Sequence, residues 1–479
     1  MNTARLKRIS ALLLVPAGLM LFLMTGCTVG PKYVRPQVPA PPAYRGAHND
    51  AVSSPNQGSL GDEDWAKVFN EPELQNLIRT ALVNNYDVRI AAQHVLEAQA
   101  QLRVTRAQEF PTVSVGGTGA GADLGSSALG STGSGFPTGA VAFGSFNLSA
   151  AWTPDFWGLY RRQTEAQRAQ MLAQVWAQRA IRMTLVQQVA TGYFQLRSYD
   201  AQLEIAKETV KERQESVALT HTLVYGGSSP LSDLRQAQEN EYTASAQIPQ
   251  LQEEIEQEEN ALRLLLGQSP GPVAHTDPNA LAPVPQNLPV GLPSRLLERR
   301  PDILEAEEQL VAANANIGVA RAQFFPQLSI SASGGVGGSD FSQIFSPESR
   351  LIYGIGSLTQ PIFEGGKLRG QLQLSKDTKQ EMVLNYEKTI ETAFRDVSNA
   401  LIAVNKQKAT RVQQEKLVAA AADAARLARI RYQGGATSYL EVLTTDSTLF
   451  SAQLNLVSTE DAESQSLVQL YAALGGGWQ

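Results

Sequence analysis

The chain contains the same pattern twice. RAQEFPTVSV at 106–115 is echoed by RAQFFPQLSI at 321–330, and YGGSSPLSDL from Tyr225 is echoed by YQGGATSYLE from Tyr432. A spacing of about 210 residues is far longer than the 20 to 50 residues of a solenoid repeat. It therefore predicts a duplicated half-molecule, in which each half has the same order of elements.

The two repeats are expected at 63–268 and 295–479. A proline-rich connector at 269–294 separates them, and we expect it to lie in an equatorial region of the molecule. Proline-rich segments of this kind have no hydrophobic period and act as extended spacers.

The N-terminus has the features of an export signal. Three basic residues within the first eight positions precede an apolar run at 11–23, and small residues follow. The run is too short to span a bilayer and contains a proline, so residues 1–26 are predicted to be a signal peptide. No other stretch has eighteen consecutive apolar residues. Any crossing of a membrane would therefore use strands.

Cys27 is the only cysteine and directly follows this signal. A lone cysteine in an exported protein cannot form an internal disulfide. The stretch LMTGC resembles the lipobox of bacterial lipoproteins, which implies S-diacylglycerol and N-acyl groups on Cys27. Thr28 stands where an Asp would change the destination, so the resemblance implies the Gram-negative outer membrane. Residues 27–62 then read as a lipidated, proline-rich tether.

Each half carries one very long helical segment. Between Gly370 and Gly434 there is no Gly or Pro, and apolar residues recur at steps of four and three. This spacing is typical of helices that pack side by side along their length. About 60 residues of helix measure roughly 90 Å. Shorter return helices are expected at roughly 231–266 and 440–474.

Four segments alternate between apolar and small or polar residues, as tilted membrane strands do. They are expected at about 111–122, 142–154, 326–338 and 350–361. Aromatic residues cluster at the strand ends, as at a membrane interface, and they are Phe110, Trp152, Trp157, Phe325 and Phe363. An ordinary soluble hairpin with buried aromatics is the alternative.

Four strands cannot close a membrane barrel. An open sheet edge in lipid leaves backbone groups unpaired at several kcal/mol each, and the smallest barrels have eight strands. The chain is therefore expected to oligomerise, and three copies would supply twelve strands.

Several motifs resemble one known family. LPSRLLERRPDILEAEEQLVAANANIGVARAQFFPQLSI at 292–330 is the most specific, with TVGPKYVRP, PDFWG, PIFEGGKLRG and RYQGGATSYLEVL elsewhere. They resemble the TolC/OprM-type outer-membrane efflux channels, in their lipoprotein (NodT-like) branch. The resemblance implies a mainly α fold with a membrane β-barrel. A homotrimer would form a 12-stranded outer-membrane β-barrel, continued by a periplasmic α-helical barrel with an equatorial belt.

The resemblance also implies the function of a passive exit duct for drugs or other small toxic compounds. The expected partners are a periplasmic membrane-fusion (adaptor) protein, an inner-membrane RND transporter and outer-membrane lipid. Two alternatives stay open: the duct of a type I-like protein secretion system, and a structural periplasmic coiled-coil lipoprotein. A net charge of −6 argues against a nucleic-acid partner.

The same resemblance implies a gate at the periplasmic tip. Glu441 matches an acidic ring, Leu440 a hydrophobic constriction, and Thr444 a position where the family usually has Asp. Arg431 and Tyr432 match residues that link neighbouring hairpins, and the gate also includes Asp233. The adaptor-contacting tips are Gly226, Gly227, Gly434 and Gly435.

Catalytic motifs are missing from the sequence. The four histidines have no metal-ligand spacing, and there is neither a G-x-S-x-G nor a Walker motif. We therefore predict a protein that is not an enzyme and has no metal or cofactor.

Overall fold

The computed structural model describes residues 28–46, 58–124, 139–275, 289–338 and 346–478. The predicted signal peptide and Cys27 lie outside these residues. The chain divides into two compact units. The first comprises residues up to 36, 96–172 and 307–384, and the second comprises 37–95, 173–306 and 385–479. Each unit thus takes segments from both repeats of the sequence.

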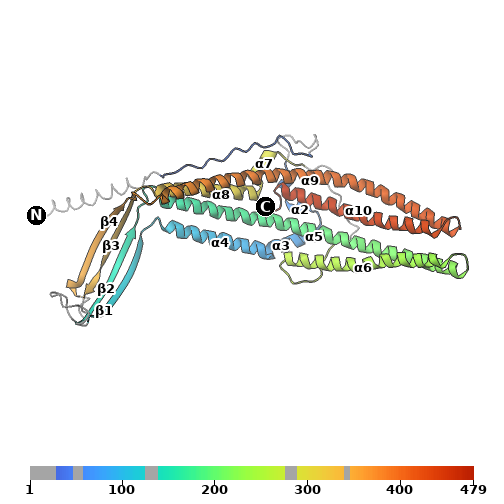
Figure 1. Cartoon of the computed structure of the whole chain (residues 1–479), viewed down its shortest axis with the longest axis horizontal. Helices are drawn as coiled ribbons and strands as arrows, with labels where there is room; N and C mark the ends of the chain where they lie inside the picture. Colours follow the sequence, from blue (N-terminus) through green and yellow to red (C-terminus); the bar gives the residue numbers. More distant parts are fainter. Residues whose placement is uncertain (1–27, 47–57, 125–138, 276–288, 339–345, 479) are drawn as a thin grey trace. The chain divides into compact units, whose positions relative to one another are not determined.

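The main helices form three pairs of equal length, with one member of each pair in each half of the sequence (Figure 1). The pairs are α4 Tyr86–Ala107 and α8 Pro301–Ala322 with 22 residues, α5 Leu159–Tyr225 and α9 Lys367–Gln433 with 67, and α6 Leu231–Leu265 and α10 Tyr439–Ala473 with 35. Shorter helices precede α4 and α8, namely α2 Trp65–Val68, α3 Pro72–Asn84 and α7 Pro293–Arg299. None of the helices in the described ranges is long and apolar enough to cross a membrane.

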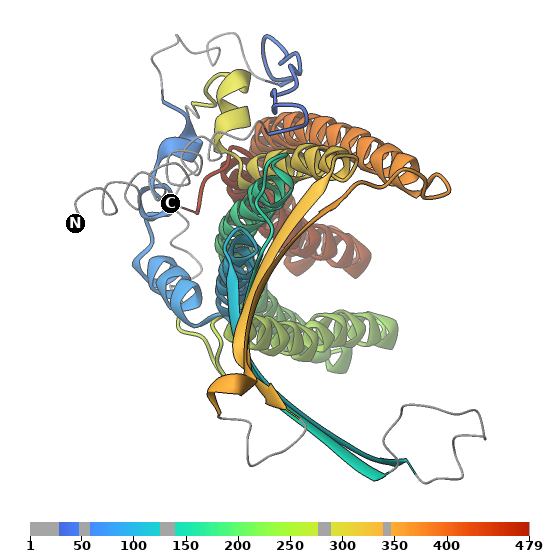
Figure 2. The ribbon, with the colours of Figure 1, turned by 90° about the vertical axis from the view of Figure 1, so that its left-hand side faces the viewer.

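The first unit contains one antiparallel sheet in the order β1-β2-β3-β4, which curves along its length (Figure 2). Its strands are β1 Thr112–Leu124, β2 Gly139–Trp152, β3 Gln327–Gly338 and β4 Arg350–Thr359. Every end lies within three residues of its sequence-based position. The sheet is open in a single chain, because β1 and β4 each have one neighbour.

The register gives the sheet one apolar and one serine-rich face. Val115 lies opposite Leu148 on the first, and Ser114 lies opposite Ser149 on the second. On the serine-rich face the hydroxyl oxygens of Ser114 and Ser149 are 2.8 Å apart, and the pairing continues to Ser333 on β3. Cross-strand hydroxyl contacts of this kind stabilise neighbouring strands.

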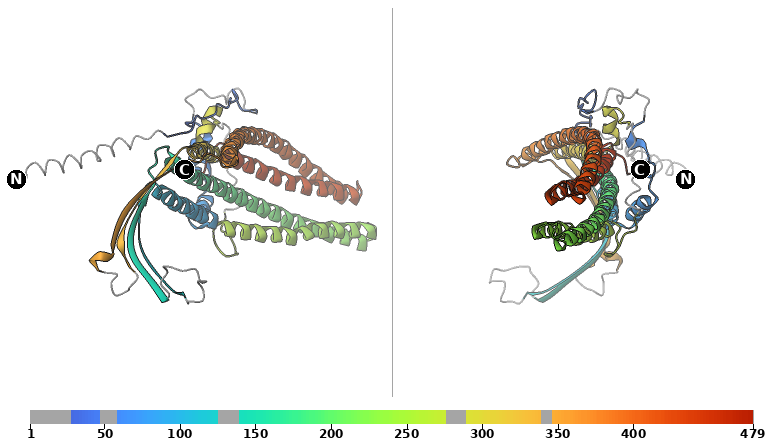
Figure 3. Two further views of the ribbon diagram at one scale, coloured as in Figure 1. Left: turned by 60° about the vertical axis from the view of Figure 1, so that its left-hand side comes forward. Right: turned by 90° about the vertical axis from the view of Figure 1, so that its right-hand side faces the viewer.

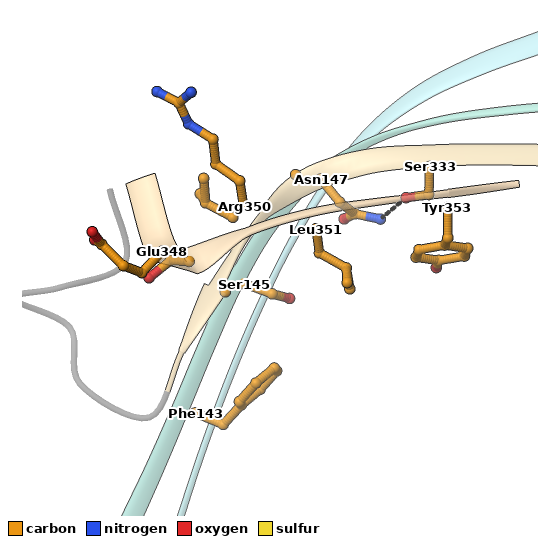
Figure 4. Close-up of a pocket in the computed structure, with 12 residues that line it drawn as sticks. Phe143, Ser145, Asn147, Ser333, Glu348, Arg350, Leu351 and Tyr353 are labelled. Carbon is orange, nitrogen blue, oxygen red and sulfur yellow. Dashed lines mark hydrogen bonds between the residues drawn. The ribbon is translucent and has the colours of Figure 1, made fainter. Parts of the chain in front are cut away.

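The last strand departs from this division. Ser333 pairs with Tyr353 and Ser331 with Ile355, so the bulky residues of β4 share the serine-rich face. Figure 4 shows a pocket on this face, where Asn147 Nδ2 donates to Ser333 Oγ at 3.4 Å beside Tyr353. Alternation along β4 therefore correctly predicts a strand, but the large side chains of β4 do not mark the apolar face of the sheet.

The second unit holds two helical hairpins, which lie side by side (Figure 3): α6 with residues 173–225 of α5, and α10 with residues 385–433 of α9. The expected row of apolar residues on α9 is buried, with exposed fractions of 6% or less at Ile390, Phe394, Val397, Leu401 and Val404. Between the hairpins Leu203 of α5, Leu251 of α6 and Phe450 of α10 belong to one apolar cluster. The period-3.5 spacing thus marks the faces that pack.

The two repeats join their helices in the same way. Asn85, just before α4, donates from Nδ2 to the carbonyl of Leu265 at the end of α6, at 3.0 Å. Arg300, just before α8, donates from Nη1 to the carbonyl of Ala473 at the end of α10, at 3.4 Å. Helix ends leave carbonyls without partners. In each repeat, the residue just before the 22-residue helix satisfies one carbonyl at the end of the 35-residue helix.

A buried ion pair fixes α3 to α5. Arg197 is 1% exposed, and its Nη1 lies 2.7 Å from Glu71 Oε2, which also accepts a bond of 2.9 Å from the Tyr193 hydroxyl. Removing one partner of a buried pair typically costs about 3–5 kcal/mol, because the other charge stays buried alone.

Glu71→Gln is therefore expected to lower the free energy of unfolding by about 3 kcal/mol, measured by denaturant titration of the purified protein. The matched control is Glu63→Gln. Glu63 pairs with Lys67 at 3.7 Å, but both side chains are more than half exposed, so its loss should cost less than about 1 kcal/mol. Equal losses in both variants would contradict a structural role for the buried pair.

Candidate functional site

The two hairpin turns have the same backbone geometry. Gly226 N–H donates to Thr222 O, and Ser228 N–H reaches back to Leu223 O at 2.8 Å. In the second hairpin, Gly434 N–H donates to Ile430 O, and Ala436 N–H reaches Arg431 O at 2.8 Å. Gly227 and Gly435 have φ of 74° and 71°. This left-handed conformation after a helix end favours glycine.

An ion pair closes the second turn. Arg431, at the end of α9, places Nη1 2.7 Å from Glu441 Oε1 in the first turn of α10. The Thr437 hydroxyl donates to the other carboxylate oxygen of Glu441. Both side chains of the ion pair are more than one third exposed, Arg431 at 54% and Glu441 at 35%. The pair therefore positions the Glu441 carboxylate more than it stabilises the fold.

A tyrosine pair connects the second turn to the first hairpin. The Tyr432 hydroxyl lies 3.4 Å from Ser229 Oγ, and its ring packs edge-on against Tyr439 at 5.4 Å between centroids. Tyr439 is 2% exposed, and its hydroxyl lies 3.3 Å from Ser216 Oγ on α5. These two weak hydrogen bonds span the hairpins near their turns.

The other predicted gate residues are Leu440, Thr444 and Asp233. Leu440 is 60% exposed on α10, and Thr444 is exposed and donates its hydroxyl to the carbonyl of Leu440 at 2.6 Å. Asp233 is half-buried in the first turn of α6, where a carboxylate interacts favourably with the helix dipole. The single chain thus leaves a leucine and a hydroxyl uncovered beside the Arg431–Glu441 pair.

A second charged network was not expected from the sequence. Arg429 of α9 places Nη2 2.6 Å from Glu212 of α5 and 3.0 Å from Asp446 of α10. Asp446 is 6% exposed, and burial raises the pKa of its carboxyl, while Arg429 opposes that shift. Arg213 of α5 is also buried and donates to the carbonyl of Asn240 on α6.

This network joins α5, α9 and α10, and Arg429, Asp446 and Glu212 lie about one, two and four turns from the hairpin ends of their helices. The signal that could have found it is charge at apolar positions of a packed helix, since Asp446 lies four residues before buried Phe450. Glu212 and Asp446 are far apart in sequence, so spacing alone could not pair them.

The aromatic residues gather at one end of the sheet. The Trp152 and Trp157 indoles donate to the carbonyls of Glu109 and Pro326, at 3.2 and 2.8 Å, and Trp157 stacks on Phe325 at 4.6 Å. Phe110 and Phe363 are 57% and 89% exposed. The predicted aromatics therefore lie at the same end of the sheet, where hydrogen bonds hold Trp152 and Trp157. Within the described residues, no three His, Cys, Asp or Glu side chains gather where they could hold a metal ion.

The model of the outer membrane efflux protein family matches residues 77–268 and 292–476, which is most of the chain. The chain belongs to this family. It is 38% identical to the cation efflux system protein CusC of Escherichia coli O6:H1 over 461 residues, covering 95% of this chain and 97% of that protein. It is 36% identical to the toluene efflux pump outer membrane protein TtgC of Pseudomonas putida over 467 residues, covering 95% and 94%.

A crystal structure of CusC gives the same fold. It superimposes with a TM-score of 0.82 at 34% identity and covers 94% of this chain and all of that chain. The predicted mainly helical fold with a four-stranded sheet is confirmed, because solved outer-membrane channels share it over nearly the whole chain. The chain is an efflux channel of the outer membrane that extends into the periplasm, and not a structural coiled-coil lipoprotein.

Proposed function

We propose that this chain is the exit duct of a tripartite efflux pump, with a periplasmic adaptor and an inner-membrane RND transporter as partners. The observation that carries the proposal is the likeness to efflux channels along nearly the whole length of both chains. The duct contributes no chemistry of its own. The polar face of its sheet lines the pathway with serine hydroxyls such as Ser114, Ser149 and Ser333.

The proposed gate lies at the second hairpin. Three copies of Leu440 close the tunnel, and Glu441, held by Arg431, forms one acidic ring beneath them. A second acidic ring is missing, because Thr444 stands at the position of the usual Asp. Asp233 adds a negative charge from the first hairpin. The Tyr432–Ser229 contact of 3.4 Å, which joins the two hairpins, holds the closed state and breaks when the gate opens.

The adaptor docks on the glycine turns at Gly226, Gly227, Gly434 and Gly435. Nothing lies within 4 Å of a Cβ built on Gly227 or Gly435, so both turns are open to a partner. In the first unit, the aromatics at the end of the sheet, listed above, sit in the membrane interface. The lipid anchor at Cys27 and the connector between the repeats complete the proposal. The two separate family matches support the division into two repeats.

The substrates are drugs or other small toxic compounds. CusC is named for cations and TtgC for toluene, and this chain is almost equally similar to both.

Deleting the gene should lower the minimal inhibitory concentration of at least one class in a panel of metal cations, organic solvents and antibiotics. Restoring the unaltered gene should reverse the change. A gene with Glu71→Gln, a substitution far in sequence from the gate residues, should reverse it in proportion to the amount of protein that folds. Unchanged susceptibility together with loss of an exported protein would instead support the type I-like secretion duct.

A further inference from the structure

An arginine-rich groove lies between α4 and α5, in the first unit. It encloses about 700 Å³ and is lined by four arginines and two glutamates; these are Arg103, Arg106, Arg161, Arg168, Glu109 and Glu165. We propose that this groove binds the phosphate headgroup of an anionic phospholipid in the periplasmic leaflet of the outer membrane.

The charge balance of the groove favours an anion. Both glutamates already have partners, because Thr164 donates to Glu109 at 2.5 Å and Arg162 pairs with Glu165 at 2.7 Å. Across the residues that the structure describes, no hydrogen bond or ion pair is made by the side chains of Arg103 and Arg106, and both are exposed. Arginine binds phosphate through a fork of N–H donors.

The tether places the groove at headgroup level. Val29 N–H donates to the Trp157 carbonyl at 3.0 Å, and Arg162 Nε donates to the Val29 carbonyl at 3.2 Å. Two residues of chain span at most about 7 Å, so the acyl groups proposed on Cys27 enter the membrane close to the start of α5. Arg161 and Arg168 follow within about 14 Å along that helix. This step rests on the proposed lipidation.

The tether also identifies the face of α5. An acylated segment must lie outside the barrel, and Arg162, which contacts it, is paired with Glu165 in the groove. Gln163 and Gln170 are about half a turn away from Glu165 on the helix, on the opposite face. The groove therefore opens toward the outside of the channel, where lipid headgroups lie. Basic pockets at such positions bind anionic headgroups in other membrane proteins.

The test uses the full-length trimer in an uncharged detergent, with native mass spectrometry to count bound dioleoyl-phosphatidylglycerol or dioleoyl-phosphatidylcholine. The unaltered protein should prefer phosphatidylglycerol. Arg103→Gln together with Arg106→Gln should weaken its binding about 30-fold, because each arginine near a membrane surface contributes about fivefold. Lysine at both positions should restore most of the affinity, because the charge returns.

The matched control is Lys367→Gln with Arg369→Gln, which removes two exposed charges of the same unit outside the groove. It should change binding less than threefold. Equal losses in the two pairs would overturn the proposal, because the attraction would then be general. Displacement of the lipid by millimolar inorganic phosphate would also overturn it, since the groove would then be a site for free anions. Neither result depends on which compounds the pump exports.

Discussion

Leu440→Asp is expected to open the channel. In the proposed trimer the substitution places three like charges around one axis. At an assumed separation of about 8 Å, each pair repels by roughly 2 kcal/mol at an effective dielectric of 20. Three pairs give roughly 6 kcal/mol, which is close to the 5.5 kcal/mol needed to move a two-state equilibrium from 1:99 to 99:1. Single-channel conductance in planar bilayers should therefore rise severalfold, and cells should become sensitive to large antibiotics such as vancomycin.

The effect should come from the gate and not from damage to the protomer, because Leu440 is 60% exposed in the single chain. Leu417→Asp on α9 is the matched control, with a leucine that is 45% exposed. It should leave the steady conductance unchanged. If Leu440→Asp trimers fold normally and conduct like the unaltered protein, the constriction lies elsewhere.

Cys27→Ser is expected to abolish lipid attachment completely. The thiol is the only group in the chain that could carry the diacylglycerol, since Cys27 is the only cysteine. Incorporation of a radioactive fatty acid should fall to background, and processing of the signal peptide at this site should stop. The sheet should still fold, because Val29 and the residues after it contact the first unit through main-chain and side-chain hydrogen bonds.

The control is Thr28→Ser, which changes the neighbouring residue and keeps the thiol. It should incorporate label normally. Label that persists on the Cys27→Ser protein would rule out the lipoprotein assignment.

Local patterns predicted the elements of this fold well. Glycines at 226, 227, 434 and 435 lie where the two hairpins turn, because a reversal after a helix needs a left-handed residue. The strands appeared within three residues of their positions, because the alternation of apolar with small or polar residues marks their extent. The row from Ile390 to Val404 is buried as its spacing predicts.

Contacts between distant segments could not be predicted. Asn85 with Leu265, Glu71 with Arg197 and Glu212 with Arg429 join residues that no local period relates. The bulky face of β4 was also ambiguous, because alternation gives a period of two and only the pairing register assigns the face. The roles of the gate residues come from family resemblance, and their geometry here is compatible with those roles.

The oligomeric state tests the account most directly, because the barrel, the gate and the closed tunnel all require three chains. A protomer with four strands leaves two sheet edges unpaired in lipid. Light scattering of the protein extracted from membranes in detergent, corrected for bound detergent, should give three times the mass of one processed chain. A monomer in a preparation that still conducts would contradict the account.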